Sequence, residues 1–229
     1  MQVALLQYTP DPETTVALAA RLCYSPASIG ELQDRLSSAD IHGFLDKIMS
    51  LGHHSVLEHA SFTFGIDGIS RVTSHQLVRH RIASFSQQSQ RYVSLKDRLA
   101  TVMPQSIEER PELRQLFASC MADLQKAYAA MVDAGIPAED ARYILPNATQ
   151  TNIIMTMNAR ELLHFFALRC CERAQWEIRG MAVEMLKLVK GVAPVIFRAA
   201  GPGCLNGPCP EGKLTCGLIS EVRERFNQL

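Results

Sequence analysis

The sequence ASFTFGIDGI, residues 60–69, decides the fold. Phe62, Phe64 and Ile66 alternate with hydroxyl side chains, which is the period of two expected of a β-strand with one buried and one wet face. We therefore predict an α+β fold, in which a mainly antiparallel sheet is packed with long helices. Three further stretches complete the predicted sheet, and they are residues 2–8, 91–94 and 152–157.

Helix signals flank these strands. Asp40 is a candidate N-cap, and Gly52 stands where a left-handed residue ends a helix. Asn158 and Glu161 have the spacing of a capping box, and they open an amphipathic pattern that reaches about Lys190. The predicted helices are 14–23, 40–51, 70–80, 108–131, 137–141 and 158–190.

Length and charge limit the class of protein. A chain of 229 residues with 47% apolar content is long enough to bury one sizeable core, so we predict a single domain over residues 1–229. The 23 basic and 23 acidic side chains cancel, which disfavours broad binding to nucleic acid. No apolar run reaches the roughly 20 residues of a membrane helix, and the N-terminus lacks the pattern of a signal peptide. We expect a soluble, cytoplasmic protein with no membrane partner.

A Cys-, Gly- and Pro-rich extension begins at about residue 201. Cys204, Cys209 and Cys216 are spaced C-x4-C-x6-C, without the paired C-x-x-C spacing and fourth ligand of a structural zinc site. The total of seven cysteines is odd, and a secreted disulfide framework is not expected. The sequence assigns no role to this extension.

Histidines gather in one part of the chain. Five of the seven fall within 28 residues, at His53, His54, His59, His75 and His80. His54 and Glu58, four residues apart, are types that ligate zinc or iron, but Gly52 and Ser55 disfavour the regular helix that would align them. Solvated or structural histidines are the other interpretation, and we expect no metal.

Residues 79–92, RHRIASFSQQSQRY, form the most informative stretch. Three arginines and many hydroxyl and amide side chains occur there without an acid to neutralise them. Guanidinium, hydroxyl and amide donors together satisfy the oxygens of a phosphate. A solvated basic loop would explain the charges but not the density of Ser and Gln, so binding of a small anion is the favoured interpretation.

This stretch also resembles a known signature. The segment Arg79-His80-Arg81, followed after seven residues by Ser89 and then by Arg91-Tyr92, is similar to the motif of the flavin-dependent thymidylate synthases. The resemblance covers most of residues 40–200 in the order that the family has. Its other parts are Gly52-His53, Glu58-His59, Gln76, 142–146, 158–160, 168–169 and 174–177.

The resemblance implies a thymidylate synthase-complementing-like fold and a reductive methylation of dUMP to dTMP. The implied carbon donor is 5,10-methylenetetrahydrofolate, FAD reduced by NADPH carries the hydride, and the implied assembly is a homotetramer. The implied flavin contacts are His53, Ser55, Glu58, Arg79, His80, Arg81, Ile82, Gln87, Asn158, Arg160 and His164. The implied dUMP contacts are Gln76, Arg79, Gln87, Gln88, Ser89, Gln90, Arg91, Arg142 and Arg169.

Arg169 carries the implied catalytic role. A guanidinium does not lose its own proton, so it can stabilise a uracil anion and make an enzyme nucleophile unnecessary. Asn158 also fits a simple helix cap, and the two roles are compatible. Gln87 and Gln90 depart from the residues that many family members carry, which leaves details of the nucleotide contacts open. Two rival functions are a metal-dependent phosphohydrolase built on the histidines and a non-catalytic nucleotide- or RNA-binding regulator.

Overall fold

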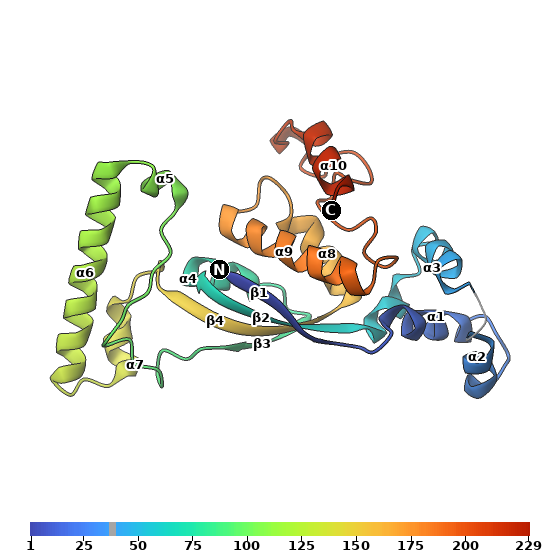
Figure 1. Ribbon diagram of the computed structural model, residues 1–229, viewed down its shortest axis with the longest axis horizontal. Coiled ribbons are helices and arrows are strands. Elements are labelled where there is room, and N and C mark those ends of the chain that lie inside the picture. Colours follow the sequence, from blue (N-terminus) through green and yellow to red (C-terminus); the bar gives the residue numbers. More distant parts are fainter. Residues whose placement is uncertain (37–39) are drawn as a thin grey trace. The chain divides into compact units, whose positions relative to one another are not determined.

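The computed structural model describes residues 1–36 and 40–229 (Figure 1). Its sheet has four strands in the order β1-β2-β4-β3, and neighbouring strands are antiparallel. The predicted α+β class is therefore confirmed, together with the strands predicted at 2–8, 60–69 and 152–157. The observed strands are β1 (Gln2–Tyr8), β2 (Ser61–Ser70), β3 (Ala83–Gln87) and β4 (Gln150–Asn158).

The predicted strand at 91–94 is wrong, because those residues form an exposed turn and the remaining strand, β3, lies earlier in the chain. β3 is at the edge of the sheet and has no buried residue, so its sequence lacks an apolar period. Beyond its end, the backbone N–H of Gln88 donates to the carbonyl oxygen of Asn152.

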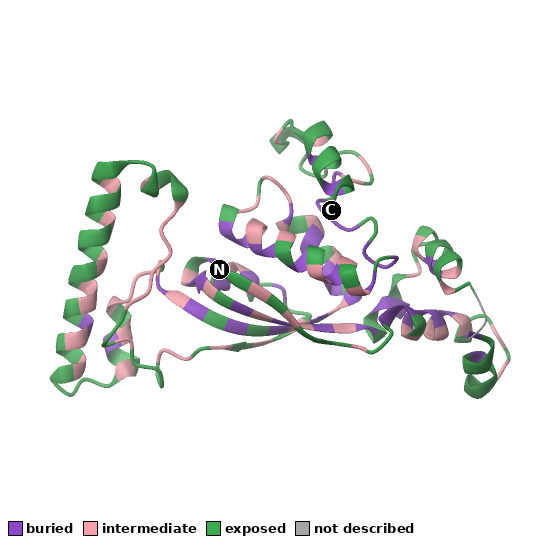
Figure 2. Cartoon of the chain, viewed as in Figure 1, coloured by how far each residue is buried: buried purple, intermediate pink, exposed green. Residues whose placement is uncertain are grey.

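The alternation that predicted β2 is visible in its burial. Phe62, Phe64 and Ile66 are buried, and the residues between them are half-buried (Figure 2). Along β4 buried residues alternate with exposed or half-buried ones in the same way. The central strands thus have one face in the core.

Two compact units make up the chain, and the boundary between them passes through the strands. The first comprises Met1–Gln2, Ile66–Arg79 and Phe85–Ile154, and the second comprises Val3–Gly65, His80–Ser84 and Met155–Leu229. The single domain over residues 1–229 stays a prediction, and each unit is described by itself.

In the first unit the long helix predicted at 108–131 is preceded by a separate short one. The long helix, α6, contains one buried residue, Tyr128, whose hydroxyl accepts from the N–H of Leu95 at 3.5 Å. Gly135 follows α6 with a φ of 86°, the left-handed conformation that favours glycine. The helices of this unit are α4 (Arg71–Leu77), α5 (Gln105–Glu108), α6 (Pro111–Asp133), α7 (Ala138–Ala141) and the 3-10 helix η2 (Arg142–Ile144).

In the second unit the helix predicted at 158–190 is two helices, because residues 170–175 form turns and bends. The side chain of Gln175 starts the second helix by accepting from the N–H groups of Glu177 and Ile178, each at 3.1 Å. Gln is not a preferred N-cap, so no signal in the sequence indicated this break. The helices are α1 (Pro12–Leu22), α2 (Ile29–Leu36), α3 (Ile41–Ser50), α8 (Ala159–Arg169), α9 (Trp176–Val192) and α10 (Ile219–Asn227), with 3-10 helices η1 (His54–His59) and η3 (Gly212–Leu214).

Aromatic rings fix α8 in the second unit. The ring of Phe197 lies edge-on to Phe62 of β2, with centroids 5.4 Å apart, and to Phe166 of α8, with centroids 6.0 Å apart. All three rings are fully buried, and each contributes roughly 1.5–3 kcal/mol by burial. α8 therefore rests on a rigid base.

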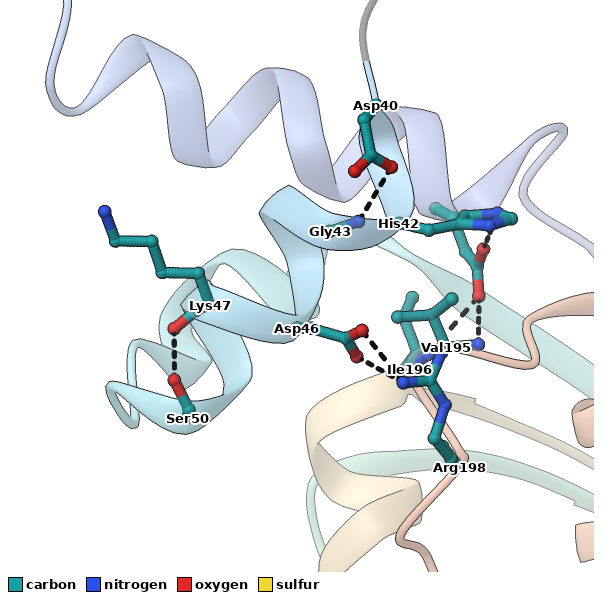
Figure 3. A network of polar contacts seen from close by, with 10 residues as sticks. Asp40, His42, Gly43, Asp46, Lys47, Ser50, Val195, Ile196 and Arg198 are labelled. Atoms are coloured by element: carbon teal, nitrogen blue, oxygen red, sulfur yellow. Dashed lines mark hydrogen bonds and ion pairs between the residues drawn. The ribbon is translucent and has the colours of Figure 1, made fainter.

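Polar contacts tie α1 and α3 to the segment after α9. Arg198 makes a two-oxygen ion pair with Asp46 of α3, with both distances 2.8 Å (Figure 3). Glu13 of α1 is buried, and its Oε1 accepts from the backbone N–H groups of Val195 at 2.6 Å and Ile196 at 3.3 Å. A carboxylate that accepts buried backbone N–H groups acts as an internal cap for that segment.

Replacing Glu13 by alanine is expected to lower the free energy of unfolding of the second unit by about 1–3 kcal/mol, because two buried N–H groups lose their acceptor. Urea unfolding followed by circular dichroism measures the change. His42 pairs with the other oxygen of Glu13 at 3.3 Å but is largely exposed, so His42→Ala is the control and should cost less than about 1 kcal/mol. Equal losses in the two variants would contradict the capping role.

Candidate functional site

A cavity of about 460 Å³ lies in the second unit. It is bounded by η1, by the residue before β3, and by the junction of β4 with α8. Five of its six lining residues are among those predicted to contact flavin, although they come from three distant parts of the sequence. The lining residues are Glu58, Ile82, Asn158, Arg160, Glu161 and His164.

An ion pair joins two sides of this cavity. The Nη1 atom of Arg160, in the first turn of α8, lies 2.5 Å from Oε1 of Glu58 in η1. Both side chains are about half exposed, so the pair contributes about 0–1 kcal/mol and can exchange partners when an anion enters. Ile82 is 69% exposed and presents an apolar surface beside these charges.

The N-terminus of α8 also faces the cavity. The Oδ1 atom of Asn158 accepts from the N–H of Glu161 at 2.9 Å, which confirms Asn158 as the predicted N-cap. The first turn of a helix carries partial positive charge and is favourable for an anion. Asn158 and Arg160 thus border the cavity with hydrogen-bond donors and a favourable dipole.

A chain of three connected side chains starts at Glu161, which lines the cavity. Nδ1 of His80 is 3.3 Å from Oε1 of Glu161, and Nε of Arg169 donates to Nε2 of the same imidazole at 3.0 Å. His80 and Glu161 are both less than one-tenth exposed, and Arg169 is half-buried. The imidazole uses both of its ring nitrogens in contacts with α8.

Burial and charge shift the pKa values of this chain. Burial first, and then the nearby Arg169 and His164, lower the pKa of His80 from 6.5 to about 4. Burial raises the pKa of Glu161, against the opposing effect of His164. His80 is therefore a neutral imidazole at pH 7, although a carboxylate lies beside it.

His53, Ser55 and Arg81, also predicted to contact flavin, are not among the residues that line this cavity. The hydroxyl of Tyr24 is 3.2 Å from Nδ1 of His53, and their rings meet edge-on. Ser55 in η1 and Arg81 are exposed. A second cavity, of about 530 Å³, is bounded by the end of α3, by His54, by the opposite side of α8 and by residues 199–203.

The remaining predicted nucleotide residues belong to the first unit. Gln87 donates through Nε2 to the hydroxyl of Thr151 at 3.2 Å, and the hydroxyl of Ser89 accepts from the N–H of Arg91 at 3.2 Å. Arg142 donates through Nε to the carbonyl of Glu139 at 3.1 Å. Arg79 and Arg91 are exposed; Gln76, in α4, and Gln90 are half-buried, and Gln88 is exposed. The gathering of these residues with Arg169 around one nucleotide stays a prediction.

Two residues were missed by the sequence reasoning, Glu161 and Arg71. Glu161 has the spacing of a capping box, but its carboxylate accepts from His80. Glu161 lies four residues before Phe165 and eight before Arg169, so all three lie on one face of α8. This spacing was the signal that could have indicated Glu161. Burial, and then the nearby Arg142, lower the pKa of Arg71. No motif in the sequence indicated this residue.

Cysteines of the extension lie around a third cavity. Cys171, after α8, shares a cavity of about 260 Å³ with Cys204, Cys209 and Cys216. Among residues 1–36 and 40–229, no three His, Cys, Asp or Glu side chains are arranged so that they could hold a metal ion. In the same part of the chain, no helix has the length and apolar character to cross a membrane.

Comparisons with known proteins agree on one family. Residues 4–195 match the family model described as thymidylate synthase complementing protein. The flavin-dependent thymidylate synthase of Geobacter sulfurreducens is 66% identical over 230 residues, covering 100% of this chain and 99% of its own. That of Clostridium tetani is 49% identical, covering 99% and 97%.

A solved structure shares the fold. The UMP/dUMP methylase PolB from Streptomyces cacaoi, bound with 5-Br dUMP, superposes with a TM-score of 0.72 at 24% identity, covering 86% of this chain and 93% of that one. At this level of identity the likeness shows the fold alone. It agrees with the match between this chain and the family model.

Proposed function

Because the chain belongs to the flavin-dependent thymidylate synthase family, we propose that it methylates dUMP at uracil C5 to form dTMP. 5,10-Methylenetetrahydrofolate is the carbon donor, and FAD, reduced by NADPH, is the hydride carrier. The observation that carries the proposal is the 460 Å³ cavity, where five residues chosen from the family motif meet. Full-length similarity to the Geobacter sulfurreducens relative supports it.

The residues around this cavity fit a flavin. Arg160 and the N-terminal turn of α8 offer donors to ring or phosphate oxygens, and exposed Ile82 offers an apolar contact. Bound there, FAD would supply the hydride for the methyl group. Glu58 pairs with Arg160, and His164 borders the same space. The other flavin contacts that the motif implies are His53, Ser55, Arg79, His80, Arg81 and Gln87.

The nucleotide site draws mainly on residues 76–91. A nucleotide monophosphate is nearly a dianion, and Ser89, Arg91 and Arg142 offer it hydroxyl and guanidinium donors. Gln76, Arg79 and the Gln87–Gln90 segment complete the proposed dUMP contacts. No acidic side chain occurs between residues 68 and 96 to compete for these donors. Binding would therefore weaken as ionic strength rises.

Arg169 acts on the uracil ring in this proposal. Its guanidinium remains protonated at every working pH, so it stabilises negative charge on the ring after loss of the N3 proton. The anion makes C5 a better carbon nucleophile, and no cysteine of the enzyme has to attack C6. Arg169 lies in the last turn of α8, a helix held by the buried phenylalanines.

The proposed assembly is a homotetramer in the cytoplasm, with active sites between subunits. The binding sites for two large cofactors and a folate need more lining residues than a chain of 229 residues easily supplies. Exposed arginines such as Arg79 and Arg91 are suited to sites completed by another subunit.

The purified protein is expected to be yellow, or to become yellow on addition of FAD. Anaerobic NADPH should bleach the visible flavin band. Addition of dUMP and 5,10-methylenetetrahydrofolate should then restore the band and yield dTMP, which chromatography detects. A chelator should leave this turnover unchanged.

Three outcomes would overturn the proposal. Protein that stays colourless after addition of FAD would show that FAD is not its cofactor. Activity lost to a chelator would favour the rival phosphohydrolase. Protein that binds dUMP but never oxidises NADPH would favour a non-catalytic regulator.

A further inference from the structure

The buried contact between His80 and α8 has a geometry that a simple core histidine does not need. Glu161, Phe165 and Arg169 occur at every fourth position of α8 and so lie on one face of the helix. The imidazole of His80 lies along that face. It contacts Glu161 at one nitrogen and Arg169 at the other, and it packs edge-on to Phe165 with ring centroids 4.9 Å apart.

The hydrogen bonds define one tautomer of the imidazole. A guanidinium has only donors, so Nε2 of His80 must keep its lone pair to accept from Arg169. The proton of the neutral ring therefore lies on Nδ1, and it is donated to Glu161. A proton added at Nε2 would meet the N–H of Arg169 and break that contact. Glu161 thus selects the form of His80 that can hold Arg169.

Other charges near the imidazole do not replace these two partners. His164, also on α8, lies with its ring centroid 6.0 Å from that of His80. The chain neighbours Arg79 and Arg81 are exposed. Arg169 and His164 are the nearby groups whose charge acts on His80, and Glu161 is the carboxylate that contacts it.

We propose that His80 and Glu161 are positioning residues, which set the plane of the Arg169 guanidinium for its action on the substrate ring. The bond to His80 uses Nε of Arg169, and an arginine held at Nε cannot rotate its planar fork without breaking the bond. The inference rests on the proposed function, because it needs Arg169 to face the uracil. It gives His80 a role that differs from the flavin contact implied by the motif.

Replacing His80 by phenylalanine is the main test, since the ring remains to pack on Phe165 while both hydrogen bonds are lost. The expected result is a fall in kcat of roughly 10- to 100-fold, with flavin content and the KM for dUMP little changed. His75→Phe is the matched control, because His75 is an exposed histidine on α4 outside the site, and its kcat should not change.

A double-mutant cycle separates positioning from a structural role. Single-turnover methylation of radiolabelled dUMP is compared for wild type, His80→Phe, Arg169→Lys and the double variant. If His80 acts through Arg169, His80→Phe should change the rate less than threefold in the Arg169→Lys background. The same full loss in both backgrounds, or loss of flavin in His80→Phe, would overturn the inference.

Glu161 offers a second variant in case His80→Phe fails to fold. Glu161→Gln keeps an acceptor for Nδ1–H and should retain most of kcat. Glu161→Ala leaves that proton without an acceptor and should lose as much as His80→Phe. Equal kcat for wild type and Glu161→Ala would overturn the inference while the proposed function stood. Wild-type protein that produces no dTMP would instead reject the proposed function.

Discussion

Arg169→Ala is expected to keep its flavin and to methylate dUMP about 100- to 1,000-fold more slowly than wild type. The side chain lies two turns along α8 from Glu161 and is not among the lining of the 460 Å³ cavity, so the flavin contacts of Glu58, Asn158 and Arg160 remain. What is lost is the positive charge that stabilises the uracil anion. The decrease should therefore appear in the methylation step.

Single-turnover rates and the visible flavin spectrum measure the two parts of this prediction. Arg169→Lys keeps the charge but loses the planar fork, so its rate should lie between those of wild type and Arg169→Ala. Arg173→Ala is the matched control, because Arg173 is an exposed arginine in the turn after α8 and should keep its rate. Near-wild-type methylation by Arg169→Ala would reject the assigned role.

The sheet could be predicted where burial gives the sequence a period. β2 and β4 are central strands with one buried face, alternation indicated β2, and both strands lie within two residues of their predicted bounds. β3 has one neighbour in the sheet and no buried residue, so Ser and Gln could occupy it without a detectable pattern. A polar edge strand such as β3 therefore leaves little trace in the sequence, whereas the edge strand β1, whose sequence is mostly apolar, was predicted at its observed bounds.

Helix boundaries were predictable where a side chain with strong preference makes the cap. Asp40 and Asn158 accept from N–H groups three residues on, as predicted. The break between α8 and α9 depends on Gln175, whose type rarely caps a helix, whereas the amphipathic pattern predicts one helix over 158–190. Periodicity alone therefore predicted one helix where the structure has two.

Part of the candidate site could be predicted from the sequence as a group of neighbours, while the roles of its residues stay a prediction. The motif named five residues that line one cavity, because their order in the chain follows a family pattern. It did not indicate that His80 turns inward to α8, since that depends on the packing of Phe165 and on the carboxylate of Glu161. Such contacts join residues about 80 positions apart, and local sequence carries no signal for them.

Acid is expected to destabilise the second unit through His80. Its pKa is about 4 in the folded chain and near 6.5 in the unfolded chain, so between these values the unfolded state binds more protons. The free energy of unfolding therefore rises with pH across this window. The contribution of His80 to stability is lost as the pH falls from 6.5 to 4. This difference between the two pKa values of His80 corresponds to a change of at most about 3 kcal/mol in the free energy of unfolding.

Glu161 acts in the opposite direction and must be removed from the comparison. Its pKa is raised in the folded chain, so the folded state takes up a proton before the unfolded one, which opposes the effect of His80. We therefore compare Glu161→Gln with the double variant Glu161→Gln/His80→Phe, by urea unfolding at several pH values between 4 and 7. Because both lack the carboxylate, the difference between their pH slopes isolates the imidazole. The single variant should lose stability more steeply toward pH 4, and parallel slopes would mean that His80 is not held neutral by its burial and by Arg169.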